Sequence, residues 1–124
     1  VMAKPRWHIL REAQGLTLAR RLPVRFDISV QITLPKAHKL YLAQQIRQDL
    51  WRRLQNLRGF TPVVQVIDYN RGLLVRAGGQ VQGAVPKQHV EDEIRALLTN
   101  SSHQSRWLTQ ARLRLQSNNC PNEG

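Results

Sequence analysis

The sequence contains few of the residues from which disulfides, thiolate metal clusters and membrane spans are built. The single cysteine among 124 residues, Cys120, excludes an intrachain disulfide and a cysteine-based metal cluster. It fits a reducing compartment, so we expect a cytoplasmic protein. No apolar run approaches the ~18 to 20 residues that cross a bilayer. The apolar segment Trp7–Leu10 ends at Arg11 and Glu12, so it is too short for an export signal. We therefore expect no membrane partner.

Acidic residues are scarce as well. Eight Asp and Glu residues stand against 19 Lys and Arg residues, and the formal net charge is +11. Arginine accounts for 15 of the 19 cations, and its planar guanidinium makes bidentate phosphate contacts and stacks on bases. A gene rich in G and C would give the same ratio, so the arginine content alone decides nothing. The net charge, in contrast, makes a polyanionic partner the first one to consider.

Apolar periodicity predicts one strand and one long helix. Residues 26–34 alternate between apolar and polar side chains, which is the pattern of a half-buried strand, and Pro35 ends it. Apolar residues then recur at spacings of three and four over residues 37–57, which predicts a helix with Gly59 just beyond its end. The exposed back of this helix is expected to carry glutamines, with Asp49 among them.

The next segments predict a hairpin and a second helix. Residues 62–67 and 73–77 have strand composition and flank the turn-forming segment Asp68–Gly72. Pro86 marks the start of a helix that is expected to end near Asn100. The β-α-β-β-α order is most of a ferredoxin-like split βαβ unit. We therefore predict an α+β fold with a three- or four-stranded antiparallel sheet and helices on one face.

Residues 104–116 decide how the sheet ends. Their content of Leu, Arg, Gln and Ala favours a helix, although the alternation of Ala111, Leu113 and Leu115 with arginines also fits an edge strand. If these residues form a helix, the sheet keeps an open edge at which a second copy can pair to give a homodimer.

The chain is expected to have three parts. Residues 26–116 form a single α+β domain that is long enough to bury a core. Residues 1–25 form a basic N-terminal arm without clean periodicity, in which we expect a short helix and an irregular or strand-like part. Residues 117–124 form a flexible polar tail.

No cluster of side chains predicts a reaction or a bound metal. His89 and Glu93 are four residues apart, as two helical metal ligands would be, but no third ligand has a matching spacing. The candidate nucleophiles and bases are scattered, and Gly78–Gly83 matches no phosphate-binding loop. We therefore expect a protein without catalytic residues, metal or cofactor.

The candidate site consists of arginines and one tryptophan. The predicted helix places Trp51 beside Arg47, with Arg58 on the same flank, which suits base stacking combined with phosphate neutralisation. A ring that only seals the rim of the core, with the arginine lying across it, is the alternative. The predicted nucleic-acid contacts are Arg20, Arg21, Arg25, Arg47, Trp51, Arg52, Arg53, Arg58, Arg71 and Arg76.

Two functions follow from these features. The first is a small basic, non-enzymatic domain that binds nucleic acid through phosphate contacts, with RNA expected ahead of DNA. The alternative is a homo-oligomeric interaction module or an adaptor subunit of an assembly, which uses the open sheet edge and has no nucleic-acid role. Steep salt dependence of binding favours the first function, and a dimer or complex that persists in moderate salt favours the second.

Overall fold

The computed structural model describes residues 7–118 of the chain and the side chains of residues 7–112. The elements are β1 (His8–Glu12), β2 (Gly15–Ala19), β3 (Ile28–Pro35), α1 (Lys39–Leu54), β4 (Phe60–Tyr69), β5 (Gly72–Val81), α2 (Lys87–Thr99) and α3 (Ser101–Asn118). The predicted tail therefore begins within α3. Residues 1–6 of the predicted arm and 119–124 of the tail, with Cys120, lie outside the described residues.

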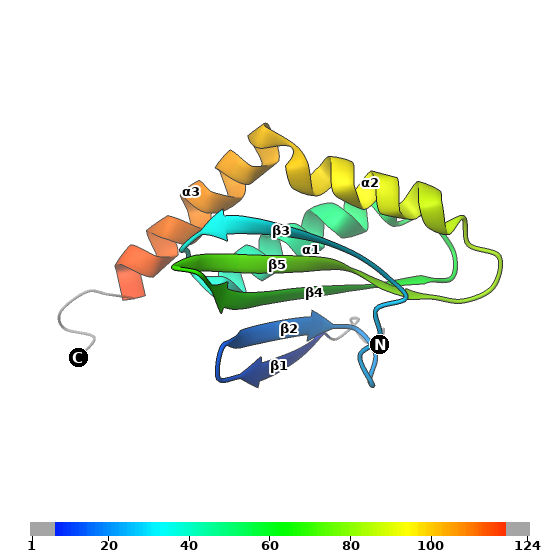
Figure 1. Cartoon of the computed structure of the whole chain (residues 1–124), viewed down its shortest axis with the longest axis horizontal. Helices are drawn as coiled ribbons and strands as arrows, with labels where there is room; N and C mark the ends of the chain where they lie inside the picture. The colour runs from blue at the N-terminus through cyan, green and yellow to red at the C-terminus, as the bar shows by residue number, and fades with distance from the viewer. Residues whose placement is uncertain (1–6, 119–124) are drawn as a thin grey trace, which may run out of the picture.

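The fold is α+β, with one five-stranded antiparallel sheet in the order β1-β2-β4-β5-β3 (Figure 1). α1 carries the chain from β3 to β4, and β5 then returns between those two strands. The predicted count of three or four strands is wrong. The sheet is larger because residues 8–19, which precede the recognised elements, form a hairpin that pairs with β4 through β2.

The β1–β2 hairpin has a weak sequence signal. Each of its strands has only five residues, and all five side chains of β1 are exposed, so the strand lacks a contrast between a core face and a solvent face. β2 is anchored by Leu16 and Leu18, which are buried and lie opposite Val66 and Val64 of β4. Residues 7–25 contain no helix.

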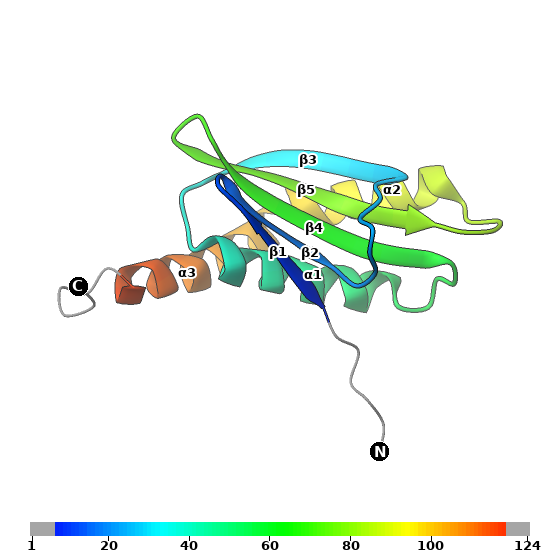
Figure 2. The same cartoon turned by 90° about the horizontal axis from the view of Figure 1, so that it is seen from below.

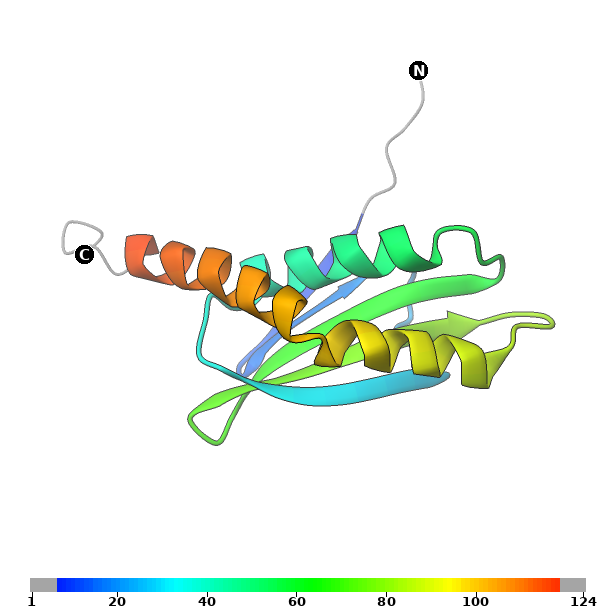
Figure 3. The same ribbon diagram turned by 90° about the horizontal axis from the view of Figure 1, so that it is seen from above.

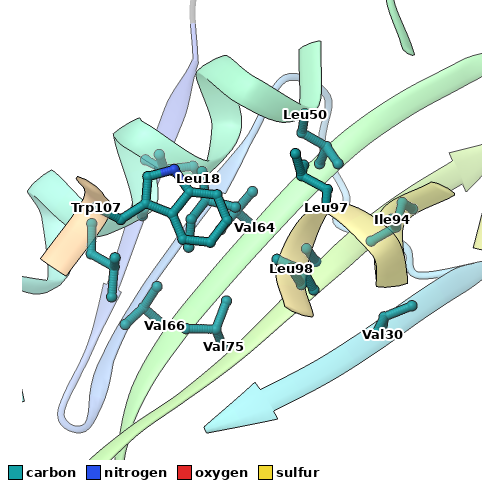
Figure 4. Close-up of a cluster of buried hydrophobic side chains, with 14 of the residues drawn as sticks. Leu18, Val30, Leu50, Val64, Val66, Val75, Ile94, Leu97, Leu98 and Trp107 are labelled. Atoms are coloured by element: carbon teal, nitrogen blue, oxygen red, sulfur yellow. The ribbon is translucent and has the colours of Figure 1, made fainter. Parts of the chain in front are cut away.

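The three helices cover the same face of the sheet (Figures 1 and 3). α1 packs mainly over β4 and β2, α2 packs over β3, and α3 packs against α1. Trp107 of α3 is fully buried among side chains that include Leu18 and Val64 (Figure 4). Residues 104–116 therefore belong to a helix whose large apolar side chain completes the core, and the edge-strand alternative is wrong.

α1 begins and ends inside the range that the sequence predicts. The His38 side chain accepts a hydrogen bond from the backbone N–H of Tyr41 at 3.1 Å, which caps the first turn. The helix ends at Leu54, so the last residues of the predicted range lie in the turn that leads to β4. Gly59 ends that turn at φ +85°, and a Cβ there would lie 2.3 Å from the Gln82 carbonyl oxygen. This close approach explains the glycine.

The β4–β5 hairpin is confirmed, and it is longer than predicted. Both residues of its two-residue turn, Asn70 and Arg71, have a positive φ, 46° and 65°. A two-residue turn with this backbone conformation matches the right-handed twist of the paired strands. The predicted second helix is also confirmed, since Pro86 precedes α2 and Asn100 follows it.

The opposite face of the sheet is crossed by the connection from β2 to β3, residues 20–27 (Figure 2). The crossing is needed because β4 and β5 lie between β2 and β3 in the sheet. Asp27 fixes the end of this connection: its carboxylate accepts the Val81 N–H at 2.9 Å, and its own N–H donates to the Gly79 carbonyl at 2.9 Å.

Within residues 7–118, no helix has the length and apolar character needed to cross a membrane.

Candidate nucleic-acid interface

One end of the sheet gathers arginines from segments that are far apart in the sequence. β2 ends there and β4 begins there, because Ala19 lies opposite Val63. Arg20 and Arg21 follow β2 directly, are exposed, and line a surface hollow together with residues 59–62. The register of β2 on β4 thus places two arginines of the predicted arm beside the turn that follows α1.

Arg58 belongs to the same end. It lies in the turn after α1 and is exposed, and its neighbour Gly59 lines the hollow that Arg20 and Arg21 also line. The predicted position of Arg58 on a helix flank is wrong, because α1 ends at Leu54. We call Arg20, Arg21 and Arg58 the basic end. No carboxylate within residues 7–112 lies at ion-pair distance from any of the three.

Trp51 lies in the last turn of α1 at this end, with 45% of its surface exposed. The ring does not pair with Arg47 in the way the sequence suggests. The Arg47 guanidinium lies instead 4.9 Å from the ring centre of Trp7, just before β1, in a cation–π contact. Partial burial lowers the pKa of Arg47, which nevertheless stays protonated near neutral pH. Trp51 is therefore partly exposed, and the guanidinium of Arg47 lies over another ring.

Three other predicted arginines are engaged with carboxylates. Arg25 contacts Asp27 at 3.0 Å and Arg53 contacts Glu93 at 2.7 Å. Arg52 lies 3.7 Å from Asp49, which is in the preceding turn of α1. Arg25 and Arg53 therefore add little unbalanced positive charge to the interface, whereas Arg52 shares the single charge of Asp49 with Arg106 and stays partly unbalanced.

The carboxylates in the two close pairs are held in their charged form. The Val81 N–H and then Arg25 lower the pKa of Asp27, and the hydrogen bond and charge of Arg53 lower the pKa of Glu93. Both carboxylates therefore stay ionised near neutral pH and keep neutralising their arginines.

Arg71 and Arg76 lie away from the basic end. Arg71 is in the β4–β5 turn, at the opposite end of both strands. Arg76 lies in the middle of β5 on the face without helices, with its guanidinium carbon 4.0 Å from the Phe26 ring centre. Its Nε is buried and has no hydrogen-bond partner within the described chain. The structure thus brings together only part of the predicted set.

Asp49 is the charged group with the closest contacts, and its position differs from the prediction. The sequence predicts it on the exposed back of the long helix, but it is only 8% exposed, because α3 packs over it. Its carboxylate accepts the indole N–H of Trp107 at 2.7 Å and a short contact from Arg106. In the sequence, Asp49 stands among glutamines on a predicted helix, and this pattern does not indicate that Arg106 and Trp107 of α3 contact it.

The predicted two-ligand spacing of His89 and Glu93 leads to no wider cluster. Glu93 is bound to Arg53, and within residues 7–118 no group of three metal-ligating side chains comes together.

Comparisons of the chain with protein-family models, with curated proteins and with solved structures gave no match.

Proposed function

We propose that the protein binds single-stranded nucleic acid, RNA ahead of DNA, at the basic end. The convergence of Arg20, Arg21 and Arg58 at one end of the sheet, without a carboxylate partner in the described chain, carries the proposal. Unpaired guanidiniums on a chain of net charge +11 attract phosphates over a distance and bind them at contact.

The arrangement favours single strands over a duplex. A helix that enters the major groove has to present a row of free polar and basic side chains. The arginines of α1 are instead held by Trp7, Asp49 and Glu93. An exposed ring such as Trp51 stacks on a base only where the base is unstacked from its neighbours, as in loops and single strands of RNA.

The salt dependence of binding tests the phosphate contacts. We expect fluorescence anisotropy with labelled single-stranded RNA to give an affinity that falls linearly with salt on logarithmic axes. The triple variant Arg20→Gln/Arg21→Gln/Arg58→Gln loses three contacts, so the slope decreases by about 2 on a single strand. Single-stranded DNA and both duplexes, measured in the same series, show whether RNA is preferred.

A charge-matched triple variant separates a local site from a general charge effect. Arg11→Gln/Arg71→Gln/Arg112→Gln removes the same charge from β1, the turn of the opposite hairpin and α3. We expect it to keep nearly all of the slope. Equal losses in the two triple variants, or no binding of the wild-type protein at low salt, would reject an interface at the basic end.

The stacking contact has its own signature. Trp51→Ala should weaken binding by about 1–3 kcal/mol, the usual contribution of one base stacked on an aromatic ring. The salt slope should stay unchanged, since no phosphate contact is lost. Trp51→Phe keeps a ring and should recover part of the affinity, whereas equal losses in the Ala and Phe variants would exclude stacking.

We further propose that residues 28–99 form a ferredoxin-like split βαβ unit without its last strand, and that α3 follows in place of that strand. The position of β5 between β3 and β4 and the two helices on one face support this proposal. In this arrangement the β1–β2 hairpin is an addition that extends the sheet beyond β4 and supplies Arg20 and Arg21 to the interface.

A further inference from the structure

Among residues 7–118, β1 and β3 are the two edge strands of the sheet and pair with no strand on their outer side, and they differ in a property that controls pairing. β1 has five residues, of which His8, Arg11 and Glu12 are ionisable, and all five side chains are exposed. β3 has eight residues, Ile28–Pro35, and none of them is ionisable. An edge strand exposes unpaired backbone N–H and C=O groups, and charged side chains are the usual protection against pairing with another strand. β1 has that protection and β3 does not.

The sequence of β3 is self-complementary about Gln31. Going outward from Gln31, the two directions give Val30 and Ile32, then Ser29 and Thr33, and then Ile28 and Leu34. If a second β3 strand lies antiparallel with its Gln31 opposite the first, each side chain therefore meets one of its own kind. Aliphatic residues meet on the helix-covered face, and hydroxyl groups meet on the other face.

We propose that two copies of the chain associate through the free edges of β3, antiparallel, with the two-fold axis at Gln31. The pairing makes one continuous sheet of ten strands, satisfies the free backbone groups of both edges, and further covers Ile32, which one copy leaves partly exposed. The inference does not depend on nucleic-acid binding, because the basic end lies at the ends of other strands.

Charges on α2 support a second copy as the occupant. α2 packs over β3, so the two copies of α2 become neighbours when the β3 edges pair (Figure 3). Glu93 faces α1, where it binds Arg53. Glu91 and Arg95 are each two residues away from Glu93, about 200° around the helix, and therefore lie on the flank that faces away from α1. In an antiparallel pair of helices, Glu91 of one copy approaches Arg95 of the other, and Arg95 also keeps its exposed 3.7 Å contact with Asp92 of its own helix.

A cysteine cross-link tests the register. In a Cys120→Ser background, Gln31→Cys places two thiols opposite each other, with Cα atoms ~4.5–5.5 Å apart, which a disulfide spans. We expect mild oxidation to give a covalent dimer on a non-reducing gel. Ser29→Cys is the matched control, since its two copies lie about 13 Å apart in this register and should stay monomeric. Cross-linking of Ser29→Cys with none of Gln31→Cys would overturn the register.

Light scattering over a dilution series tests the association itself. We expect the unmodified chain to have twice the monomer mass, and Gln31→Lys to be monomeric, because two like charges then oppose each other at the axis. Leu10→Lys places the same charge on β1 and should stay dimeric. Circular dichroism confirms that both variants are folded. A monomeric wild type, or a dimer that Leu10→Lys dissociates and Gln31→Lys does not, would reject pairing through β3.

Discussion

Two regions of the protein are built from arginine and tryptophan, and they differ in whether a carboxylate is present. Where α1 meets α3, Arg106 and Trp107 both contact the buried Asp49. At the basic end, Arg58 and the nearby Trp51 have no carboxylate partner in the described chain and are exposed. Arginine and tryptophan therefore stabilise the fold where Asp49 lies between α1 and α3. At the basic end, where no described carboxylate contacts them, the same residue types remain free for a partner.

The largest contrast is expected between the two tryptophans. Trp107→Ala empties a fully buried site and should lower the free energy of unfolding by about 3–5 kcal/mol. Trp51→Ala changes a ring that is 45% exposed and should cost less than about 1 kcal/mol. Urea denaturation followed by circular dichroism measures both. Equal losses would mean that Trp51 is a core residue, and the stacking role would fall with that result.

The next largest effect is expected at Asp49. Asp49→Ala leaves the buried indole N–H of Trp107 without its acceptor and removes the partner of Arg106, so we expect a loss of about 1–3 kcal/mol in denaturant unfolding. Asp49→Asn keeps an acceptor oxygen for the indole and should lose less. Nucleic-acid binding of the folded protein should be unchanged in both variants, and a loss of binding would show that the two regions are coupled.

The sequence predicts the elements whose signal is local. The alternation in β3, the turn at Asn70 and Arg71 and the spacing in α1 are properties of neighbouring residues, and each of these elements is present. The sequence predicts only an arm with a short helix and an irregular or strand-like part where β1 and β2 lie, because β2 pairs with β4, some fifty residues further along the chain, and β1 pairs only with β2. Pattern analysis detects a half-buried face, and β1 has none.

The candidate site follows the same rule. Arg20 and Arg21 could be named as basic residues of the arm, but their closeness to Arg58 depends on the register of β2 on β4. The burial of Asp49 likewise depends on the position of α3, which no local pattern specifies. Composition therefore predicts that arginines matter, and only the fold separates those that carboxylates neutralise from those that remain free.

A smaller effect is expected where an arginine is paired at the surface. Arg53→Gln removes the partner of Glu93 and should lower the thermal midpoint slightly, because partly exposed ion pairs contribute little and are screened by salt. It should also return the pKa of Glu93 toward its ordinary value. Arg58→Gln removes an equal charge that has no described partner and should leave the midpoint unchanged. A drop for Arg58→Gln as large as that for Arg53→Gln would reveal a hidden partner and weaken the case for a free basic end.

The smallest effect is expected at Asp27, where a surface carboxylate is held by the Val81 N–H and by Arg25. Because these contacts lower its pKa below the ordinary 3.8, the stabilisation is complete at higher pH and is lost as the pH falls through the lowered value. The stability advantage of the wild type over Asp27→Asn should therefore shrink below about pH 3.8. Since the backbone hydrogen bond is the larger cause, the advantage near neutral pH should survive added salt, whereas binding at the basic end should not. An advantage that disappears in salt would instead assign the effect to Arg25 and place Asp27 with the screened surface pairs.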